Sequence, residues 1–243
     1  MALDRRIMFI ALIAALATAC GPVRIPPILL FSGTGTSSGS VEGIERVLSS
    51  EHLNYSRADS QQLNRMSESE LREYRLLIVP GGNFEQIGDS LTVSTAGNIR
   101  NAIWSGVSYL GLCAGAFFAG NSPYNGLNLT SGVRFGFYAA EDQGIRKAVV
   151  AITAATGQTL DQYWEDGPQL AGWGSVAAKY PDGTPAVVQG AAGEGWVILT
   201  GFHPEAQSSW RRGMEFRTPV NVTNAYAATL IRAAMNREPL PQF

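Results

Sequence analysis

The sequence predicts an α/β fold in which short buried strands alternate with helices. Ile28–Phe31 and Leu76–Val79 are wholly apolar and stop at Ser-Gly and Pro-Gly-Gly, as strands buried on both faces of a parallel sheet do. Between them, Val41–Ser50 has apolar residues at helical spacing. Strands that alternate with helices in this way predict a parallel sheet with right-handed crossovers.

The rest of the chain continues this pattern and then departs from it. We expect a helix over 95–105, a strand over 107–112, a helix over 114–119, a last central strand over 196–202 and a closing helix over 222–235. The region 127–189 is rich in Gly, aromatic residues and short alternating runs, so it predicts inserted β-hairpins on or beside the sheet.

Length and composition point to one domain with one sizeable core. The chain has 243 residues, of which 45% are hydrophobic and 16% charged, and its net charge is -2. Scattered Lys and Arg give no electrostatic footprint for nucleic acid. No His, Cys and Asp cluster has metal-ligand spacing, and Gly33–Gly39 lacks the Lys of a phosphate-binding loop. We therefore expect no metal and no cofactor, and interpret Gly33–Gly39 as a loop at the rim of a site.

The N-terminus predicts export. Residues 1–20 contain Arg5 and Arg6 followed by an apolar run, Ile7–Ala17, of the length of a signal-peptide core. The segment 17–21 (Ala-Thr-Ala-Cys-Gly) resembles a bacterial lipobox, which predicts lipidation at Cys20. Ordinary signal cleavage after Ala19, or a retained membrane anchor, are the alternatives. The expected location is the bacterial cell envelope, lipid-anchored, facing the periplasm or the cell exterior.

The predicted domain bounds follow from this. Residues 21–27 form a tether, 28–236 the domain and 237–243 a tail.

The sequence 111–115 (Gly-Leu-Cys-Ala-Gly) predicts a nucleophile elbow. It lies between an expected strand and an expected helix, and a tight strand-to-helix turn needs small residues such as Gly111 and Gly115. Cys113 would lie at the start of the helix, where the dipole favours a thiolate. The sequence has two Cys in all, so Cys113 has no partner if Cys20 is lipidated or removed. A buried structural Cys is the alternative.

His203 is the expected base for this nucleophile. A cysteine nucleophile needs a base, and the chain has two His. His52 lies in a polar helix end and is interpreted as a surface residue. His203 follows the last central strand, at the edge where open α/β sheets place their ligands. Glu205 comes two residues later and is placed to orient the imidazole.

The sequence 80–83 (Pro-Gly-Gly-Asn) supplies the expected oxyanion hole. The backbone N–H groups of Gly81 and Gly82 can turn towards a pocket, and that of Ala114 can join them. An ordinary Gly-rich turn is the alternative. The residues Tyr163, Trp164, Trp173, Trp196 and Trp210 are candidates for a substrate cleft, although core packing is the more common role of such residues. Residues 208–212 are a weaker candidate for a wall of the pocket.

Taken together, the motifs 80–82, 111–115 and 203–205 resemble the class I glutamine amidotransferases. Within that superfamily, Ser105–Ala119 is similar to the elbow segment of the biotin–protein ligase N-terminal domain family. Residues 33–37 resemble that family's first loop, and 163–172 its inserted hairpin. The resemblance covers roughly Ile28–Gln207. It implies a flavodoxin-like three-layer sandwich with a mostly parallel central sheet, and a Cys-His-Glu triad. It does not imply biotin ligation, which belongs to a separate catalytic domain of the ligases.

The expected function is a cysteine-dependent hydrolase or acyl-transfer enzyme. Cys113 would attack a small-molecule or peptide amide, with His203, Glu205 and the oxyanion donors in support. The first alternative is a catalytically silent envelope lipoprotein that keeps the fold to bind a ligand or partner. The second is an envelope accessory protein that acts through its inserted hairpins. The sequence does not identify a protein partner.

Overall fold

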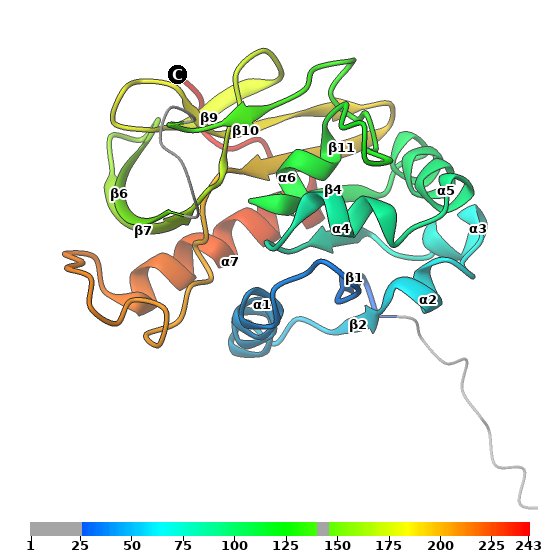
Figure 1. Ribbon diagram of the computed structural model, residues 1–243, viewed down its shortest axis with the longest axis horizontal. Helices are drawn as coiled ribbons and strands as arrows, with labels where there is room; N and C mark the ends of the chain where they lie inside the picture. The colour runs from blue at the N-terminus through cyan, green and yellow to red at the C-terminus, as the bar shows by residue number, and fades with distance from the viewer. Residues whose placement is uncertain (1–25, 140–145) are drawn as a thin grey trace, which may run out of the picture.

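The computed structural model describes residues 26–139 and 146–243, which contain one nine-stranded sheet. The strand order is β2-β1-β3-β4-β11-β10-β9-β6-β7 (Figure 1). The predicted export signal, Cys20 and tether residues 21–25 lie outside the described residues. No helix among the described residues has the length and apolarity needed to cross a membrane.

Five parallel strands form one half of the sheet. Their spatial order, with the first strand between the second and third, is that of flavodoxin-like folds. The strands are β1 (Ile28–Phe31), β2 (Tyr55–Ala58), β3 (Leu76–Val79), β4 (Ser108–Leu112) and β11 (Gly195–Thr200). The register pairs Ile28 with Leu76 and Val79 with Gly111. The strands predicted at 28–31, 76–79, 107–112 and 196–202 are therefore present within one or two residues of these bounds.

Strand β2 was not predicted, because its sequence lacks the apolar run of the others. Tyr55–Ala58 is a strand at the edge of the sheet with one buried residue. An edge strand has a neighbour on one side only, so it needs less apolar surface than the central strands.

Four antiparallel strands form the other half of the sheet. They are β6 (Lys147–Ala154), β7 (Thr159–Glu165), β9 (Ser175–Lys179) and β10 (Pro185–Ala192). The predicted hairpins therefore extend the central sheet instead of forming a layer of their own. A separate pair, β5 (Gly136–Phe137) and β8 (Pro168–Gln169), lies outside it.

Helices cover both faces of the parallel half. The first face carries α1 (Ser38–Ser50) and α7 (Val220–Asn236), which contact each other. The second face carries α5 (Val93–Trp104) and α6 (Ala114–Ala119), together with the short helices α2 (Ser60–Leu63), α3 (Glu68–Leu71) and α4 (Phe84–Asp89) (Figure 1). The expected three-layer sandwich is therefore confirmed.

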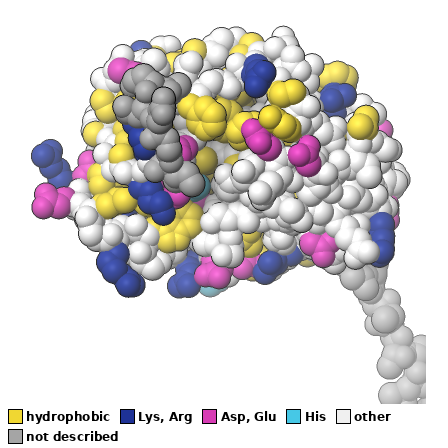
Figure 2. Space-filling model, viewed as in Figure 1, with side chains coloured by type: hydrophobic (Ala, Val, Ile, Leu, Met, Phe, Trp, Pro, Cys, Tyr) yellow, Lys and Arg dark blue, Asp and Glu magenta, His cyan; other side chains and the backbone are white. Residues whose placement is uncertain are grey.

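Two hydrophobic clusters, one on each face of the sheet, hold these layers together. Ile28 and Leu30 belong to the cluster under α1 and α7, whereas Leu29 and Phe31 belong to the cluster under α5 and α6. This alternation explains why the parallel strands are apolar at every position. In the view of Figure 2, many of the hydrophobic side chains left at the surface lie over the β-rich upper left of the molecule.

The C-terminal tail packs against the antiparallel half. The Leu240 N–H donates to the Gln189 side chain, and the Gln189 amide donates to the Leu240 carbonyl, each at 2.7 Å. The Phe243 N–H donates to the Val176 carbonyl at 2.9 Å. Residues 240–243 are thus anchored to the sheet.

Candidate active site

Cys113 occupies a strained turn between β4 and α6. Its φ of 48° and ψ of -103° are unusual for a residue with a side chain, and such a conformation costs about 1–3 kcal/mol. A Cβ on Gly115 would overlap the Val79 carbonyl, and one on Gly111 would overlap the Gly115 carbonyl. The two glycines therefore allow β4, α6 and β3 to meet closely enough to turn the Cys113 side chain into a cavity.

His203 and Glu205 follow β11 and form a buried pair. The distance between His203 Nδ1 and Glu205 Oε1 is 2.9 Å, and the residues are 4% and 0% exposed. Two aromatic rings pack against the imidazole and against each other: the centroid of Tyr163 is 5.8 Å from that of His203, and the centroid of Trp210 is 5.2 Å from it. The backbone N–H of His203 donates to the Tyr163 carbonyl at 2.8 Å. The structure thus fixes both the position and the orientation of the ring.

The imidazole and the Cys113 thiol line the same cavity. Burial opposes protonation of His203, but the Glu205 carboxylate and the Cys113 thiol outweigh it and raise the pKa of His203 well above its ordinary value. An imidazole held between a carboxylate and a thiol can accept the thiol proton and stay positively charged. This is the arrangement that a cysteine nucleophile requires.

Ser40, on α1, connects this pair to the Pro80-Gly81-Gly82 loop. Its hydroxyl donates to Glu205 Oε1 at 2.6 Å and accepts from the Gly81 N–H at 3.0 Å. The side chain is completely buried. Gly43, one turn further along α1, lets the segment that carries Glu205 approach the helix, because a Cβ there would lie 2.7 Å from the Glu205 carbonyl oxygen. Sequence reasoning missed Ser40. The signal was a polar residue at i, i+4 spacing from Ile44 on the buried face of α1.

The Ser40 bond changes the expected oxyanion hole. The Gly81 N–H is already used by Ser40, which removes Gly81 from the predicted donors. Gly81 is instead needed for space, because a Cβ there would overlap the imidazole carbon Cε1 of His203. Within the described residues, the N–H groups of Gly82 and Ala114 have no hydrogen-bond partner. These two remain the candidates.

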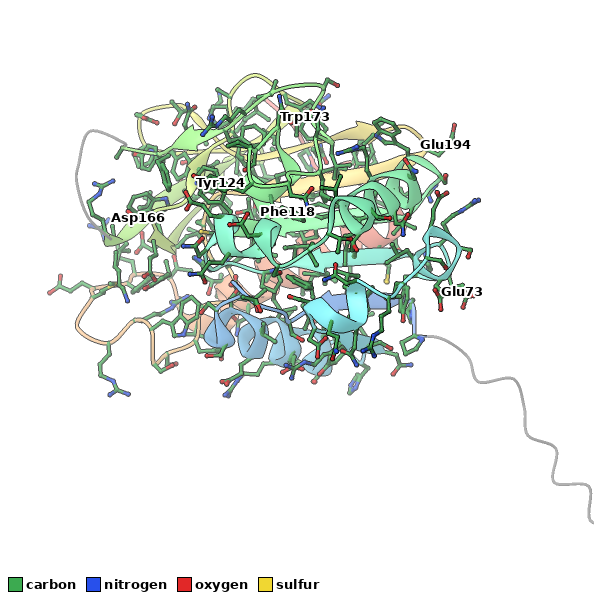
Figure 3. All side chains as sticks on the ribbon, turned by 45° about the vertical axis from the view of Figure 1, so that its right-hand side comes forward. Glu73, Phe118, Tyr124, Asp166, Trp173 and Glu194 are labelled. Carbon is green, nitrogen blue, oxygen red and sulfur yellow. The ribbon has the colours of Figure 1, made fainter. Side chains whose placement is uncertain are left out.

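A cavity of about 430 Å³ opens above the thiol. It lies at the carboxyl ends of the parallel strands, where α/β sheets place their ligands. In Figure 3, Asp166 marks this side of the sheet, while Glu73 and Glu194 lie at the opposite end. The cavity is lined by Cys113 and His203 of the predicted triad, by both oxyanion candidates, by polar residues Ser37, Asn83, Glu85, Glu165 and Asp166, and by aromatic residues Phe84, Phe117, Phe137 and Trp210. Its volume is in the range of small-molecule sites.

Residues 27–125 match the family model described as the N-terminal region of biotin-protein ligase. The resemblance inferred from the motifs is confirmed. No curated protein matches the sequence.

Solved structures match over most of the chain and show the fold. A glutamine amidotransferase is 16% identical, with a TM-score of 0.58 over 84% of this chain and 99% of that one. PurLQS from Thermotoga maritima is also 16% identical, with a TM-score of 0.59 over 86% and 99%. The exo-beta-1,4-mannosidase Op5Man5 from Opitutaceae bacterium strain TAV5 is 16% identical. It matches 86% of this chain with 36% of its own, at a TM-score of 0.52. The protein therefore has a class I glutamine amidotransferase-like fold.

Some of the other candidate residues line the cavity, and the rest lie outside it. Trp210 and Ser37 line the cavity, the latter from the Gly33–Gly39 loop. His52 is exposed at the end of α1, and Arg211 is buried against Thr218 and Thr223. Trp164 and Tyr163 belong to the core, while Trp173 and Trp196 are partly buried beside it. Among the described residues, no group of His, Cys, Asp or Glu could hold a metal ion.

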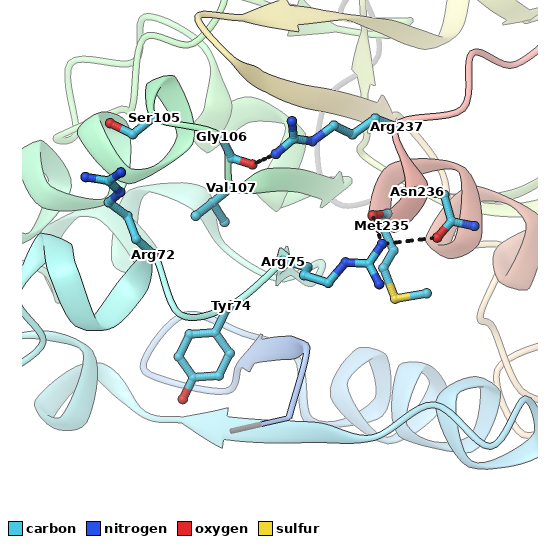
Figure 4. A pocket seen from close by; sticks show the side chains of 9 residues that line it. All are labelled: Arg72, Tyr74, Arg75, Ser105, Gly106, Val107, Met235, Asn236 and Arg237. Atoms are coloured by element: carbon cyan, nitrogen blue, oxygen red, sulfur yellow. Dashed lines mark hydrogen bonds between the residues drawn. The ribbon is translucent and has the colours of Figure 1, made fainter. Parts of the chain in front are cut away.

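A second hollow, of about 360 Å³, lies at the amino ends of the parallel strands (Figure 4). Three arginines line it. Arg75 donates to the Met235 carbonyl at 3.3 Å, and Arg237 donates to the Gly106 carbonyl. Met235 lies in the last turn of α7, so Arg75 stabilises that helix terminus. Gly106 lies in the turn between α5 and β4. The hollow contains none of the predicted triad residues.

Proposed function

We propose that the protein is a cysteine-dependent hydrolase or acyl-transfer enzyme that acts on an amide-type substrate. The observation that carries the proposal is the placement of the His203 imidazole between the Glu205 carboxylate, at 2.9 Å, and the Cys113 thiol at a strained elbow. A structural cysteine needs neither the strained backbone nor a buried His-Glu pair. Their coincidence at the mouth of a cavity favours chemistry.

In the proposed reaction, the Cys113 thiolate adds to the amide carbonyl. The negative charge on the carbonyl oxygen is stabilised by the N–H groups of Gly82 and Ala114. Collapse breaks the C–N bond, and imidazolium His203 gives its proton to the leaving amine. Water, deprotonated by the same imidazole, then cleaves the thioester. Glu205 keeps the ring oriented and stabilises its positive charge throughout.

Alkylation of the thiol tests the proposal. We expect iodoacetamide to modify Cys113 faster than an ordinary thiol at neutral pH, and His203→Gln to slow that reaction. His52→Gln is the matched control, because His52 is exposed and outside the cavity. A library of amides and peptides, scored by mass spectrometry for an acyl adduct on Cys113, would then identify substrates. If Cys113 is alkylated at the rate of a free cysteine and His203→Gln does not change that rate, the proposed enzymatic function is wrong.

One contact favours a second candidate, a catalytically silent binding protein. The Cys113 sulfur lies 3.5 Å from the Glu165 carbonyl oxygen, which is a position for a neutral, donating thiol. A silent protein would keep the fold and the cavity to hold a ligand. It would show an unreactive Cys113, and Cys113→Ser would leave every phenotype intact.

We further propose that the protein is exported and lipid-anchored through Cys20, on the pattern of residues 1–21. Ammonia transfer to a synthase partner would then be excluded by location, so hydrolysis is the favoured reaction. Metabolic labelling with palmitate should mark the protein and disappear in Cys20→Ala. Label that persists in this variant would rule out Cys20 as the lipid site.

A further inference from the structure

One wall of the cavity is aromatic and lies beside the nucleophile. Phe117 is on α6, one turn after Cys113, and its ring centroid is 4.7 Å from that of Phe84 and 4.8 Å from that of Phe137. Three separate elements, α4, α6 and β5, therefore bring their rings to one place. Phe137 is 44% exposed, which is unusual for a Phe, and all three residues line the cavity. Phe117 is 5% exposed and Phe84 is partly buried, so Phe137 supplies most of the apolar surface that this cluster leaves open to a ligand.

The cavity is also lined by carboxylates. Glu165 and Asp166 lie at the end of β7, and Glu85 lies on α4, next to Phe84. Two of these carboxylates have a cation nearby. Lys147 lies 3.5 Å from Glu165, while Arg146 lies 4.0 Å from Asp166 and donates to the Ala139 carbonyl. Among the described residues that line the cavity there is no Lys or Arg.

This distribution of charge disfavours a substrate carboxylate. A carboxylate that enters the cavity loses water and meets three carboxylates, and the described residues of the lining offer it no Lys or Arg. The His203 imidazole is already paired with Glu205 at 2.9 Å. A flat apolar group, in contrast, would cover the exposed Phe137 ring and release water from it. The cavity therefore differs in chemistry from a site for a free amino acid such as glutamine, which carries a carboxylate.

We infer that the substrate is a small amide with a flat apolar group near its carbonyl and no carboxylate. The inference rests on the proposed function and narrows its substrate class. The apolar group would lie against Phe84, Phe117 and Phe137, with the reacting carbonyl over Cys113. The carboxylates that line the cavity favour a neutral or positively charged remainder.

A matched set of chloroacetamides tests the inference on the whole folded domain. The three probes are the chloroacetamides of benzylamine, ethylamine and glycine, in which Cys113 sulfur displaces chloride and forms a thioether. Each rate is divided by that of the same probe with free cysteine. We expect the benzyl probe to react about tenfold faster than the ethyl probe, and the glycine probe to be the slowest of the three.

Two variants locate the effect. Phe137→Ala should remove most of the benzyl advantage, whereas Trp104→Ala, a similarly exposed aromatic outside the cavity, should preserve it. Glu85→Lys should speed the glycine probe several-fold, because it places a cation at the cavity, and Glu73→Lys, which lies outside it, should not.

The outcomes separate this inference from the proposed function. If no probe reacts with Cys113 faster than with free cysteine, the proposed function fails. If Cys113 is reactive but the glycine probe reacts as fast as the benzyl probe or faster, the proposed enzymatic function is retained and the inferred substrate class is wrong. The same holds if Phe137→Ala and Trp104→Ala behave alike.

Discussion

Ser40→Ala tests whether one buried hydroxyl organises the site. The hydroxyl donates to Glu205 at 2.6 Å and accepts from the Gly81 N–H at 3.0 Å, in a place with no access to water. Its removal costs a hydrogen bond to a charged group, about 1.5–3 kcal/mol, and leaves a buried N–H unpaired, which costs about 1–3 kcal/mol. We expect a loss of about 3 kcal/mol or more in the free energy of unfolding, measured with urea.

The same change should slow alkylation of Cys113. If the lost bond contributes about 1.4 kcal/mol to holding Glu205 and the imidazole in the reactive position, the rate falls about tenfold. Ser40→Thr keeps a hydroxyl and should recover part of the rate if the variant folds.

Ser108→Ala is the matched control for both measurements. Ser108 is also buried, on β4, but its hydroxyl has no partner among the described residues. Its removal should leave the stability and the alkylation rate close to those of the unmodified protein. If Ser40→Ala matches Ser108→Ala in both, Ser40 has no positioning role and the reasoning is refuted.

Three further predictions address the loop, the imidazole and the tail. Gly81→Ala places a methyl group against the imidazole of His203 and should slow alkylation of Cys113 at least about tenfold. Gly97→Ala is the control, because its methyl group would have no neighbour within 4 Å. Equal alkylation rates in the two variants would contradict the prediction. Burial opposes protonation of His203, but the neighbouring carboxylate and thiol raise its pKa well above the ordinary value. The protonated ring therefore stabilises the fold below about pH 6.5, and this contribution is lost as the pH rises through the raised pKa. The Tm difference between the unmodified protein and His203→Gln should therefore shrink as the pH rises above about 6.5. A Tm difference that does not change with pH would be evidence against a raised pKa of His203. Deletion of residues 240–243 leaves the buried Gln189 amide without either partner and should cost about 1–3 kcal/mol in urea unfolding, whereas an unchanged midpoint would show that the tail contributes nothing.

Much of the fold could be predicted because it depends on local sequence. Strands buried on both faces must be apolar at every position, so Ile28–Phe31 and Leu76–Val79 stand out without any knowledge of their neighbours. The elbow is local as well, because the turn at Cys113 needs Gly111 and Gly115 at fixed offsets. The edge strand β2 lacks such a signal, and the sequence did not predict it.

The sequence by itself determined which residues could react. It offers two histidines, and only His203 follows a buried strand, which is why the order of residues alone is enough to pair His203 with Cys113. Only the tertiary structure decided how the site is supported. Ser40 and Glu205 are 165 positions apart, and no local pattern relates them.

The sheet must assemble before the Ser40 hydroxyl can donate to the Glu205 carboxylate. The same hydroxyl accepts from the Gly81 N–H, which removes this N–H from the candidate oxyanion donors. The strand pairing that turns the predicted hairpins into half of the central sheet is non-local for the same reason. Side-chain periodicity determines which face of a segment is buried. Which strand or helix covers that face depends on packing between segments that are distant in the sequence.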